Sequence, residues 1–360
     1  MSRKKALIAM SGGVDSSVAA ALTLRQGYTC IGCTMKLFSN EDAGLSRSRT
    51  CCSLEDVEDA RDVAWRLGIP YHVFNFTAAF RETVIDPFVR CYEAGMTPNP
   101  CIACNRYLKF GALLDRARVL GCDRIVTGHY ARIERENGRY VLKKALDETR
   151  DQSYVLYFLT QDQLAHILFP LGCMRKEAVR QLAERHGFGN ARKPDSQDIC
   201  FVPDGDHAAM IARYRGKPPL PGDFLAPDGS VLGTHRGIVR YTVGQRRGLG
   251  ISAPEPLYVC QIDAAANTVT LGPASHLFHR AAEITDFHWI AGEPPPAPIR
   301  CKARIRYRQP EQPATAIPTG TDTVRLIFDA AQRAVTPGQA AVLYRGDTVL
   351  GGGVIAGAGD

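Results

Sequence analysis

Short apolar runs alternate with amphipathic stretches along residues 1–205. The apolar runs have the length of buried strands and lie at residues 6–10, 29–35, 71–76 and 124–127. The amphipathic stretches carry apolar residues at helical spacing and lie at residues 16–26, 54–67, 105–120, 161–168 and 175–186. Strands that alternate with helices form parallel sheets. The pattern therefore predicts an α/β domain, residues 1–205, built on a doubly wound parallel sheet.

The pattern changes after residue 205, where short β-prone runs and turn residues replace the helices. Within the first domain, Asn137-Gly138 lies between two short β-prone runs and predicts a β-hairpin. Proline clusters at residues 218–221 and 294–298 mark breaks between segments. We therefore expect a small β-rich central domain at residues 206–282 and a C-terminal β-barrel domain at residues 283–360.

The composition is that of a soluble protein with more than one domain. A chain of 360 residues is longer than a single hydrophobic core usually accommodates. It contains no apolar run long enough to cross a bilayer. Residues 6–10 are too short for the hydrophobic region of a secretory signal, so we expect a cytoplasmic protein. Lys and Arg outnumber Asp and Glu by 44 to 37, and the resulting net charge of +7 favours a polyanionic partner.

A glycine-rich loop of sequence SGGVDSS, residues 11–17, lies between the first predicted strand and the first predicted helix. Glycines let the backbone approach a phosphate, and amides at a helix start bind its oxygens. No lysine follows the glycines at the spacing of a Walker A loop. The loop instead resembles the PP-loop of ATP pyrophosphatases, which cleave ATP between the α and β phosphates and transfer AMP to a substrate oxygen. That resemblance implies that Asp15 lies near the phosphates and the metal.

Two Cys-x-x-Cys pairs make a shared zinc site the first alternative to consider. Cys30 and Cys33 lie at an odd separation in a predicted strand, so their side chains point to opposite faces and suit buried packing. Cys101 and Cys104 lie just before a predicted helix, whose amides favour a reactive thiolate. Cys200 ends the polar segment DSQDIC and is a third candidate thiol.

Together these segments closely resemble the tRNA-specific 2-thiouridylases, sulfurtransferases that act on the wobble uridine of Lys, Glu and Gln tRNAs. The resemblance covers almost the whole chain. It rests on eight segments, which read SGGVDSS (11–17), TPNPCIACN (97–105), TGHY (127–130), DQSY (151–154), DSQDICF (195–201), TVGQRRGLG (242–250), RYRQ (306–309) and TPGQ (336–339).

The resemblance implies roles for individual residues. Cys104 is the nucleophile, and Cys200 carries the persulfide sulfur. The implied ATP site consists of Ala9, Met10, Ser11, Gly12, Gly13, Val14, Asp15, Ser16, Met35 and Gly128. The implied tRNA contacts are Asn99, Pro100, Cys101, His129, Arg150, Asp151, Gln152, Arg306, Tyr307 and Gln339, of which residues 99–101 face the target base.

One position departs from the family pattern. Many members carry Asp where this chain has Cys101, so a third thiol lies beside the nucleophile. Cys101, Cys104 and Cys200 are therefore also candidate ligands of a [4Fe-4S] cluster with one iron open to sulfide, as in related tRNA thiolases. The sequence leaves the persulfide route and the cluster route open.

In the persulfide route, ATP with Mg²⁺ adenylates O2 of the uracil ring, and Cys200 delivers sulfur received from a persulfide-carrying donor protein. Attack of Cys104 on Cys200 then leaves a disulfide bond. A different PP-loop enzyme, such as a lysidine or amide-forming synthetase, is an alternative that needs no reactive thiols. A tRNA-binding or sulfur-carrying module without turnover is another, and tRNA-dependent pyrophosphate release distinguishes it.

Overall fold

The computed structural model describes residues 3–38, 54–194, 199–202 and 205–359. Contacts divide the chain into two units. The first comprises Met1–Val84, Cys101–Gly205 and Gly346–Val349, and the second comprises Ile85–Pro100, Asp206–Arg345 and Leu350–Asp360. The division into three domains stays a prediction. Residues 85–100 belong to the second unit, although the sequence pattern assigns them to the first domain.

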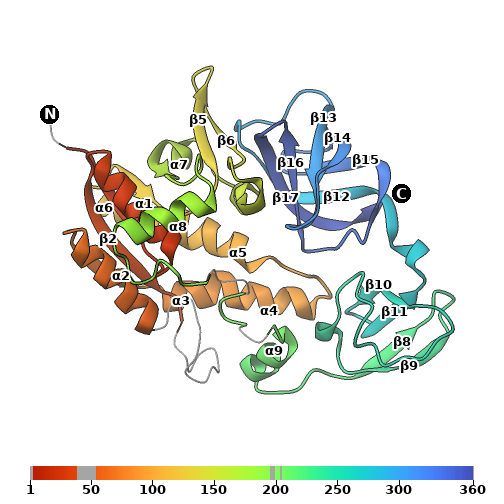
Figure 1. Ribbon diagram of the computed structural model, residues 1–360. Helices are drawn as coiled ribbons and strands as arrows, with labels where there is room; N and C mark the ends of the chain where they lie inside the picture. Colours follow the sequence, from red (N-terminus) through yellow and green to blue (C-terminus); the bar gives the residue numbers. More distant parts are fainter. Residues whose placement is uncertain (1–2, 39–53, 195–198, 203–204, 360) are drawn as a thin grey trace. The chain divides into compact units, whose positions relative to one another are not determined.

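A five-stranded parallel sheet forms the centre of the first unit (Figure 1). Its order is β3-β2-β1-β4-β7, and its neighbouring strands pair in parallel. The strands are β1 (Lys5–Ala9), β2 (Thr29–Lys36), β3 (Tyr71–Asn75), β4 (Arg124–Val126) and β7 (Ile167–Leu168). The predicted doubly wound sheet is confirmed. Because the strand order reverses between β1 and β4, the carboxyl end of β1 is where such sheets bind ligands.

Helices cover this sheet, including α1 (Val14–Arg25), α2 (Leu54–Arg66) and α8 (Lys176–Arg185). Helix α1 contacts β1, β2 and β4, and it also contacts α8, so α1 and α8 lie side by side over the sheet (Figure 1). The predicted apolar face of α2 is buried and joins the core cluster of the sheet and α1. Within the described residues, none of the helices combines the length and the hydropathy that a bilayer crossing needs.

The helical stretch after β3 differs most from its prediction. It contains α3 (Thr77–Phe80), η1 (Arg81–Ile85) and α4 (Asp86–Glu93), and then α5 (Pro100–Ala103), the π-helical η2 (Cys104–Ala112) and α6 (Leu113–Val119). The sequence predicts a helix at residues 105–120, whereas the structure begins it at Pro100. Proline suits the first helical position because its φ is already helical and its missing N–H needs no acceptor there. The thiols of Cys101 and Cys104 therefore lie within the helical stretch, and their predicted place before it is wrong.

A β-hairpin follows β4, as predicted, and consists of β5 (Arg132–Glu136) and β6 (Arg139–Lys143). Asn137 and Gly138 have φ values of 48° and 82°, the positive values that a two-residue turn of this kind requires. Strand β6 also pairs with Thr348. The chain then reaches β7 through η3 (Glu148–Arg150), η4 (Ser153–Leu156) and α7 (Gln161–His166).

The second unit contains α9 (His207–Arg215) and a four-stranded sheet of order β10-β11-β8-β9. Its strands are β8 (Gly222–Leu225), β9 (Val231–His235), β10 (Tyr258–Asp263) and β11 (Thr268–Gly272), with η5 (Ile238–Arg240) and η6 (Ala274–Leu277) beside them. Phe224, Val259 and Leu271 are fully buried in this small module. The β-rich central module is therefore confirmed.

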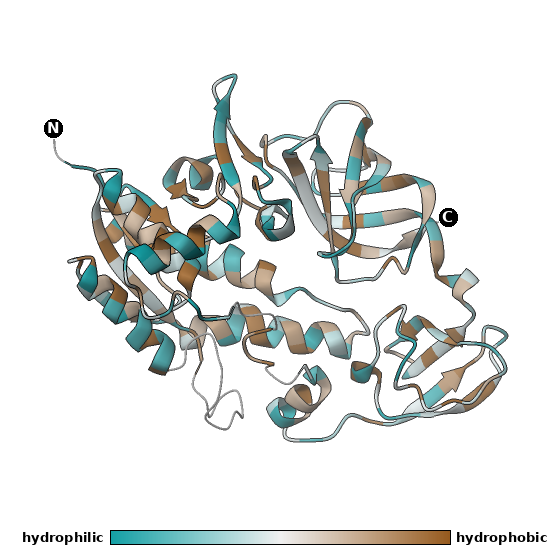
Figure 2. Ribbon diagram, in the orientation of Figure 1, coloured by the Kyte–Doolittle hydropathy of each residue, from teal (hydrophilic) through white to brown (hydrophobic). Residues whose placement is uncertain are grey.

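Six further strands close into a barrel of order β12-β15-β14-β13-β16-β17, and pairing of β12 with β17 completes the ring. They are β12 (Phe278–Trp289), β13 (Ile299–Arg304), β14 (Gln312–Pro318), β15 (Val324–Arg333), β16 (Ala340–Arg345) and β17 (Thr348–Gly359). Figure 2 shows hydrophobic and hydrophilic positions alternating along these strands. Inward residues such as Ala303, Leu326 and Leu343 form the core, so the predicted barrel is confirmed.

Candidate functional site

The loop between β1 and α1 wraps closely around the start of the helix. Gly12 has a φ of +75°, and a side chain there would come within 2.4 Å of the Asp56 carbonyl oxygen. The Ser11 N–H donates to Ser16 Oγ at 3.2 Å, and Ser16 Oγ donates to the Gly13 carbonyl at 3.0 Å. Gly13 caps α1 without a side-chain hydrogen bond. No cap side chain therefore competes for the amides of the first turn, which are the groups that bind phosphate.

Asp15, in the first turn of α1, is held by two side chains. Lys176 Nζ donates to both carboxylate oxygens at 2.8 Å, and the Tyr130 hydroxyl donates to Asp15 Oδ1 at 2.8 Å. The Lys176 side chain is only 5% exposed, so removal of the Asp15 charge would leave the ammonium group poorly solvated. Asp15 and Lys176 therefore act as one coupled unit beside the loop.

Asn190, beyond the end of α8, fastens the loop from the other side. Its Nδ2 donates to the Gly12 carbonyl at 2.8 Å and to Ser17 Oγ at 2.9 Å. Its Oδ1 is buried and has no hydrogen-bond partner within the described part of the chain. Asn190 thus links the conformation of the glycine loop to the segment that continues toward Cys200.

Lys193 ties the same segment to α2. Its Nζ donates to Asp56 Oδ1 at 2.7 Å and to Asp59 Oδ2 at 2.6 Å. Burial lowers the pKa of Lys193, but the hydrogen bonds to the two carboxylates outweigh burial and raise that pKa above its ordinary value. Lys193 is therefore a charged anchor for the residues that directly follow α8.

The predicted ATP-site residues outside the loop lie at strand ends. Met10 and Met35 are buried at the ends of β1 and β2. A side chain on Gly128 would lie 2.8 Å from the Ser16 nitrogen, so the chain after β4 passes directly against the start of α1. The structure thus brings the segment after β4 to the loop at the point where the strand order reverses.

The segment of the predicted base contacts enters the helical stretch. Asn99 is half-buried and Pro100 is buried. Cys101 follows in the first turn of α5 with an exposed side chain, and the half-buried Cys104 begins η2. The positive end of a helix favours a thiolate in its first turn, an effect that falls off within one turn. Cys101 lies in that first turn, and Cys104 lies three residues later.

Asn105 fixes the start of η2. Its buried Nδ2 donates to the Val155 carbonyl at 3.3 Å, and its Oδ1 lacks a hydrogen-bond partner among the described residues. This contact holds the residue beside Cys104 against η4. The nine-residue π-helical segment η2 begins at the candidate nucleophile.

Cys200 lies near the same helices. Residues 195–198 of its motif lie outside the described residues, whereas Cys200 is half-buried. The neighbouring Phe201 is buried, and its ring meets that of Phe80 edge-on with centroids 5.6 Å apart. Phe80 ends α3, and α3 contacts η2, which begins at Cys104. Cys104 and Cys200 therefore lie on segments that both pack against α3.

The buried cysteines of β2 have a packing role, as predicted. Burial raises the pKa of Cys30 to about 11 and raises that of Cys33 still further, so both stay protonated. Within the described residues, no three His, Cys, Asp or Glu side chains are grouped to hold a metal ion. Cys101, Cys104 and Cys200 all belong to these residues, so the placement of their thiols gives the cluster route no support.

His129, a predicted tRNA contact, is 7% exposed. Its Nδ1 is 2.7 Å from Thr127 Oγ1, and its ring packs against Phe110 and Phe169. Burial, assisted by the charge of Lys109, lowers the pKa of His129 well below its ordinary value. The ring is therefore neutral near pH 7 and supports the end of β4.

The DQSY segment also has structural contacts. Asp151 is buried and accepts hydrogen bonds from the backbone and hydroxyl of Ser153. Gln152 Oε1 accepts from the Tyr130 N–H at 2.9 Å, and Arg150 is half-buried at the end of η3. Contact of these residues with tRNA stays a prediction.

The remaining predicted tRNA contacts lie in the second unit. Tyr307 is 40% exposed, which suits stacking on an unpaired base. Arg306 Nη2 donates to Thr336 Oγ1 at 2.7 Å and also to two backbone carbonyls. Gln339 Nε2 donates to the Thr97 carbonyl at 2.8 Å. Arg306 and Gln339 thus have partners within the protein.

Models of three known domain families match the chain in succession. They are described as a tRNA methyl transferase HUP domain (residues 4–204), a tRNA methyl transferase PRC-barrel domain (residues 208–273) and an aminomethyltransferase beta-barrel domain (residues 279–355). The first alone covers more than half of the chain.

Curated proteins match over nearly the full length. The tRNA-specific 2-thiouridylase MnmA of Symbiobacterium thermophilum is 49% identical, with 98% of this chain and 92% of the relative covered. The proteins of the same name from Clostridioides difficile and Geotalea uraniireducens are 48% and 50% identical, with 98% of this chain and 98% and 95% of the relatives covered. The chain belongs to the tRNA-specific 2-thiouridylase family.

In this 2-thiouridylase family member, Lys176 and Asn190 are site residues that sequence reasoning missed. A lysine at the start of a predicted helix opposes the helix dipole, and that local mismatch was a usable signal for Lys176. Asn190 follows a helix, where asparagine is an ordinary turn residue, so the sequence contained no signal for its contacts.

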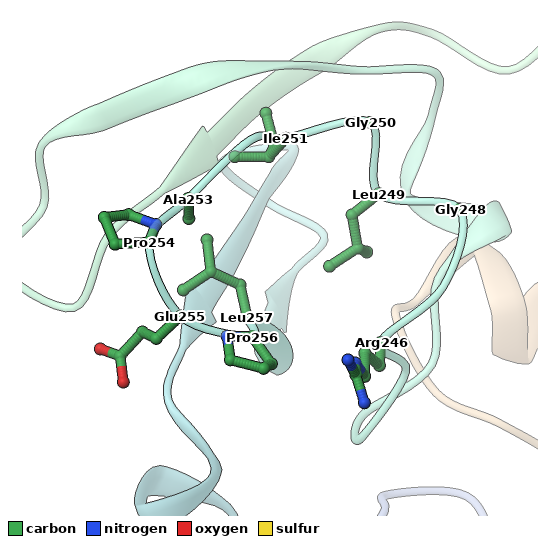
Figure 3. A pocket seen from close by; sticks show the side chains of 10 residues that line it. All are labelled: Arg246, Gly248, Leu249, Gly250, Ile251, Ala253, Pro254, Glu255, Pro256 and Leu257. Atoms are coloured by element: carbon green, nitrogen blue, oxygen red, sulfur yellow. The ribbon is translucent and has the colours of Figure 1, made fainter.

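A hollow of about 390 Å³ lies along segment 246–257 in the second unit of this family member (Figure 3). Glycine, proline and aliphatic side chains make up most of its wall, together with Arg246 and Glu255. None of the residues predicted for ATP, sulfur or tRNA binding lines this hollow, so it adds nothing to the predicted chemistry.

Proposed function

We propose that the chain is a cytoplasmic tRNA-uridine 2-sulfurtransferase that thiolates the wobble uridine, position 34, of Lys, Glu and Gln tRNAs at the expense of ATP. The observation that carries this proposal is the glycine loop at the carboxyl end of β1, with Lys176 beside it. Cys104 and Cys200 lie in the same unit. Membership of the 2-thiouridylase family supports sulfur transfer to tRNA as the overall reaction.

The first step is transfer of AMP to O2 of the uracil ring. The amides of the first turn of α1 bind the phosphates, and Lys176 holds the Asp15 carboxylate in place beside that turn. Adenylation converts a poor oxide leaving group into AMP.

Mg²⁺ would be held by one or two carboxylates together with substrate phosphates, with Asp15 as the candidate carboxylate, and it would offset the charge that develops on the pyrophosphate. Both oxygens of Asp15 accept hydrogen bonds from Lys176. We therefore expect phosphate oxygens and water to supply most Mg²⁺ ligands.

The second step is sulfur transfer from a persulfide on Cys200. Its terminal sulfur forms a bond with C2, and AMP leaves with the original oxygen. The Cys104 thiolate then attacks Cys200 Sγ and breaks the sulfur–sulfur bond, so the transferred sulfur stays on the base and a Cys104–Cys200 disulfide forms. A cellular reductant reopens the disulfide, and a donor protein reloads Cys200. The shared packing of both segments against α3 supports this pairing.

The wobble base must leave the anticodon stack to reach a buried site. The net charge of +7 favours tRNA through its phosphates, and the exposed Tyr307 provides a ring for stacking. We propose that Arg150 and Arg306 assist this contact.

Incubation of the protein with ATP, Mg²⁺, a persulfide donor and unmodified Lys tRNA tests the function. We expect 2-thiouridine at the wobble position, detected by nucleoside mass spectrometry, and pyrophosphate release that depends on the tRNA. A matched transcript with cytidine at the wobble position is the control. Pyrophosphate release with conversion of a base other than this uridine would favour a different PP-loop enzyme.

A further inference from the structure

Thr97 is held by the β-rich part of the second unit. Its N–H donates to the Pro337 carbonyl at 2.9 Å, and its carbonyl accepts from Gln339 Nε2 at 2.8 Å. Its hydroxyl lies 3.3 Å from the Thr242 hydroxyl. All three polar groups of Thr97 therefore have partners in other segments. We call Thr97, Thr242, Pro337, Gly338 and Gln339 the Thr97 clamp.

Gly338 allows the backbones of the clamp to meet. Its φ is +88°, and a side chain on it would lie 2.8 Å from the Thr97 nitrogen. A larger residue would thus be strained in its own conformation and would displace Thr97 as well.

The barrel side of the clamp is itself fixed. The Gly338 N–H donates to the Ile355 carbonyl, and the Ile355 N–H donates to the Gln339 carbonyl, both at 2.8 Å. Arg306 Nη2 donates to Thr336 Oγ1 and to the Val243 carbonyl, and so links the TPGQ segment to the 242–250 motif. The clamp therefore holds Thr97 against the framework of the barrel.

Three of the motifs noted in the sequence meet at this clamp. Thr97 begins TPNPCIACN, Thr242 begins TVGQRRGLG, and Gln339 ends TPGQ. The chain continues from Thr97 through Asn99 and Pro100 directly into Cys101 and Cys104. We propose that the Thr97 clamp sets the position of residues 97–100, the segment that is predicted to present the target base, with Gly338 and Gln339 as positioning residues.

This role differs from direct contact with tRNA. Substitution of a residue that only contacts tRNA changes the affinity for tRNA and leaves the protein without tRNA unaltered. Substitution of a positioning residue alters the protein even without tRNA. It also lowers the reaction rate of the tRNA complex, because small misplacements of reacting groups slow a reaction strongly. The catalytic half of the inference rests on the proposed function, whereas the structural half does not.

Hydrogen exchange in the protein without tRNA tests the structural half. Gln339→Met keeps the side-chain length and removes the donor, and Gly338→Ala adds strain. We expect amides in residues 96–104 to exchange about fivefold faster or more in both variants, as loss of one hydrogen bond implies. Gln312→Met is the matched control, because Gln312 lies in the same barrel and its side chain donates to the Pro310 carbonyl, two residues away in the sequence.

If residues 96–104 of Gln339→Met exchange at the wild-type rate, the proposed clamp is refuted. Should Gly338→Ala fail to fold, the result for Gln339→Met alone decides whether the clamp exists. Absence of thiolation by the wild-type protein would refute the proposed function and leave the exchange result valid.

Steady-state kinetics test the catalytic half. In Gln339→Met we expect kcat for 2-thiouridine formation to fall about tenfold, with little change in KM for tRNA. A raised KM with unchanged kcat would assign Gln339 to tRNA contact alone and would refute the positioning role. Gln312→Met should match the wild type in both constants.

Discussion

Asp15 and Lys176 neutralise each other at the start of α1, and Lys176 is nearly inaccessible to solvent. We expect Asp15→Asn to lower the free energy of unfolding by about 3 kcal/mol, because it leaves the buried Lys176 ammonium group without its carboxylate. Lys176→Met should lower it by less, because Asp15 is 29% exposed and keeps the hydrogen bond from Tyr130. The double variant should recover most of that stability, whereas tRNA-dependent pyrophosphate release should stay lost in all three. Urea unfolding and a pyrophosphate assay measure the two properties. Wild-type stability and activity of Lys176→Met would contradict the coupled role.

The thiols act after adenylation in the proposed reaction, so their loss should spare the first step. We expect Cys104→Ser and Cys200→Ser to abolish 2-thiouridine formation while tRNA-dependent pyrophosphate release continues. Cys173→Ser is the matched control, since Cys173 is an exposed thiol of the same unit. Full 2-thiouridine formation by either variant, measured by nucleoside mass spectrometry, would falsify the assignment.

Substitution of Cys101 distinguishes the persulfide route from the cluster route. The persulfide route needs only Cys104 and Cys200, so Cys101→Ala should reduce activity by disturbing the surroundings of Cys104 without abolishing it. Complete loss of thiolation in Cys101→Ala, together with iron and labile sulfide in anaerobically purified wild-type protein, would favour the cluster.

At the scale of elements, the glycine loop depends on a segment that follows α8. Asn190→Leu removes the hydrogen bonds that the Asn190 side chain donates to the Gly12 carbonyl and to Ser17 Oγ. We expect the free energy of unfolding to fall by about 1–3 kcal/mol and ATP affinity to fall about tenfold.

Calorimetry with ATP measures the affinity of Asn190→Leu. Asn75→Leu is its control, because the Asn75 side chain accepts hydrogen bonds from Thr77 at an exposed site. Equal ATP affinities of the two variants would show that the loop keeps its shape without Asn190.

At the scale of the whole molecule, two buried histidines give stability a defined pH dependence. Burial lowers the pKa of His129 and, against weaker opposing contacts, that of His235. Below the ordinary pKa of about 6.5, the unfolded chain binds protons that the folded protein does not. Stability should therefore fall as the pH drops from about 7 to about 5, by at most about 1.4 kcal/mol per pH unit for each group.

Urea midpoints at several pH values check this prediction. His129→Gln should show a weaker pH dependence than the wild type, whereas His72→Gln, an exposed position on β3, should retain it. Identical pH profiles for the two variants would show that His129 does not contribute.

Local patterns determined much of the fold. The apolar runs placed β1 to β4, helical spacing placed α1, α2 and α8, and Asn137-Gly138 placed the hairpin turn, since each signal needs only neighbouring residues. The start of the helix at Pro100 was missed, because proline fits both a turn and a first helical turn. The glycine loop and the candidate thiols could also be identified from the sequence, because their residue types and the predicted elements next to them are sufficient.

The tertiary structure alone decided which residues support that site. Lys176 meets Asp15 across 161 residues, Asn190 meets Gly12 across 178, and Gln339 meets Thr97 across 242. No periodicity or turn signal encodes such pairs, because they form only when separate segments fold against one another. The sequence therefore determined the elements and the chemical groups, and the packing of distant segments determined how those groups are held.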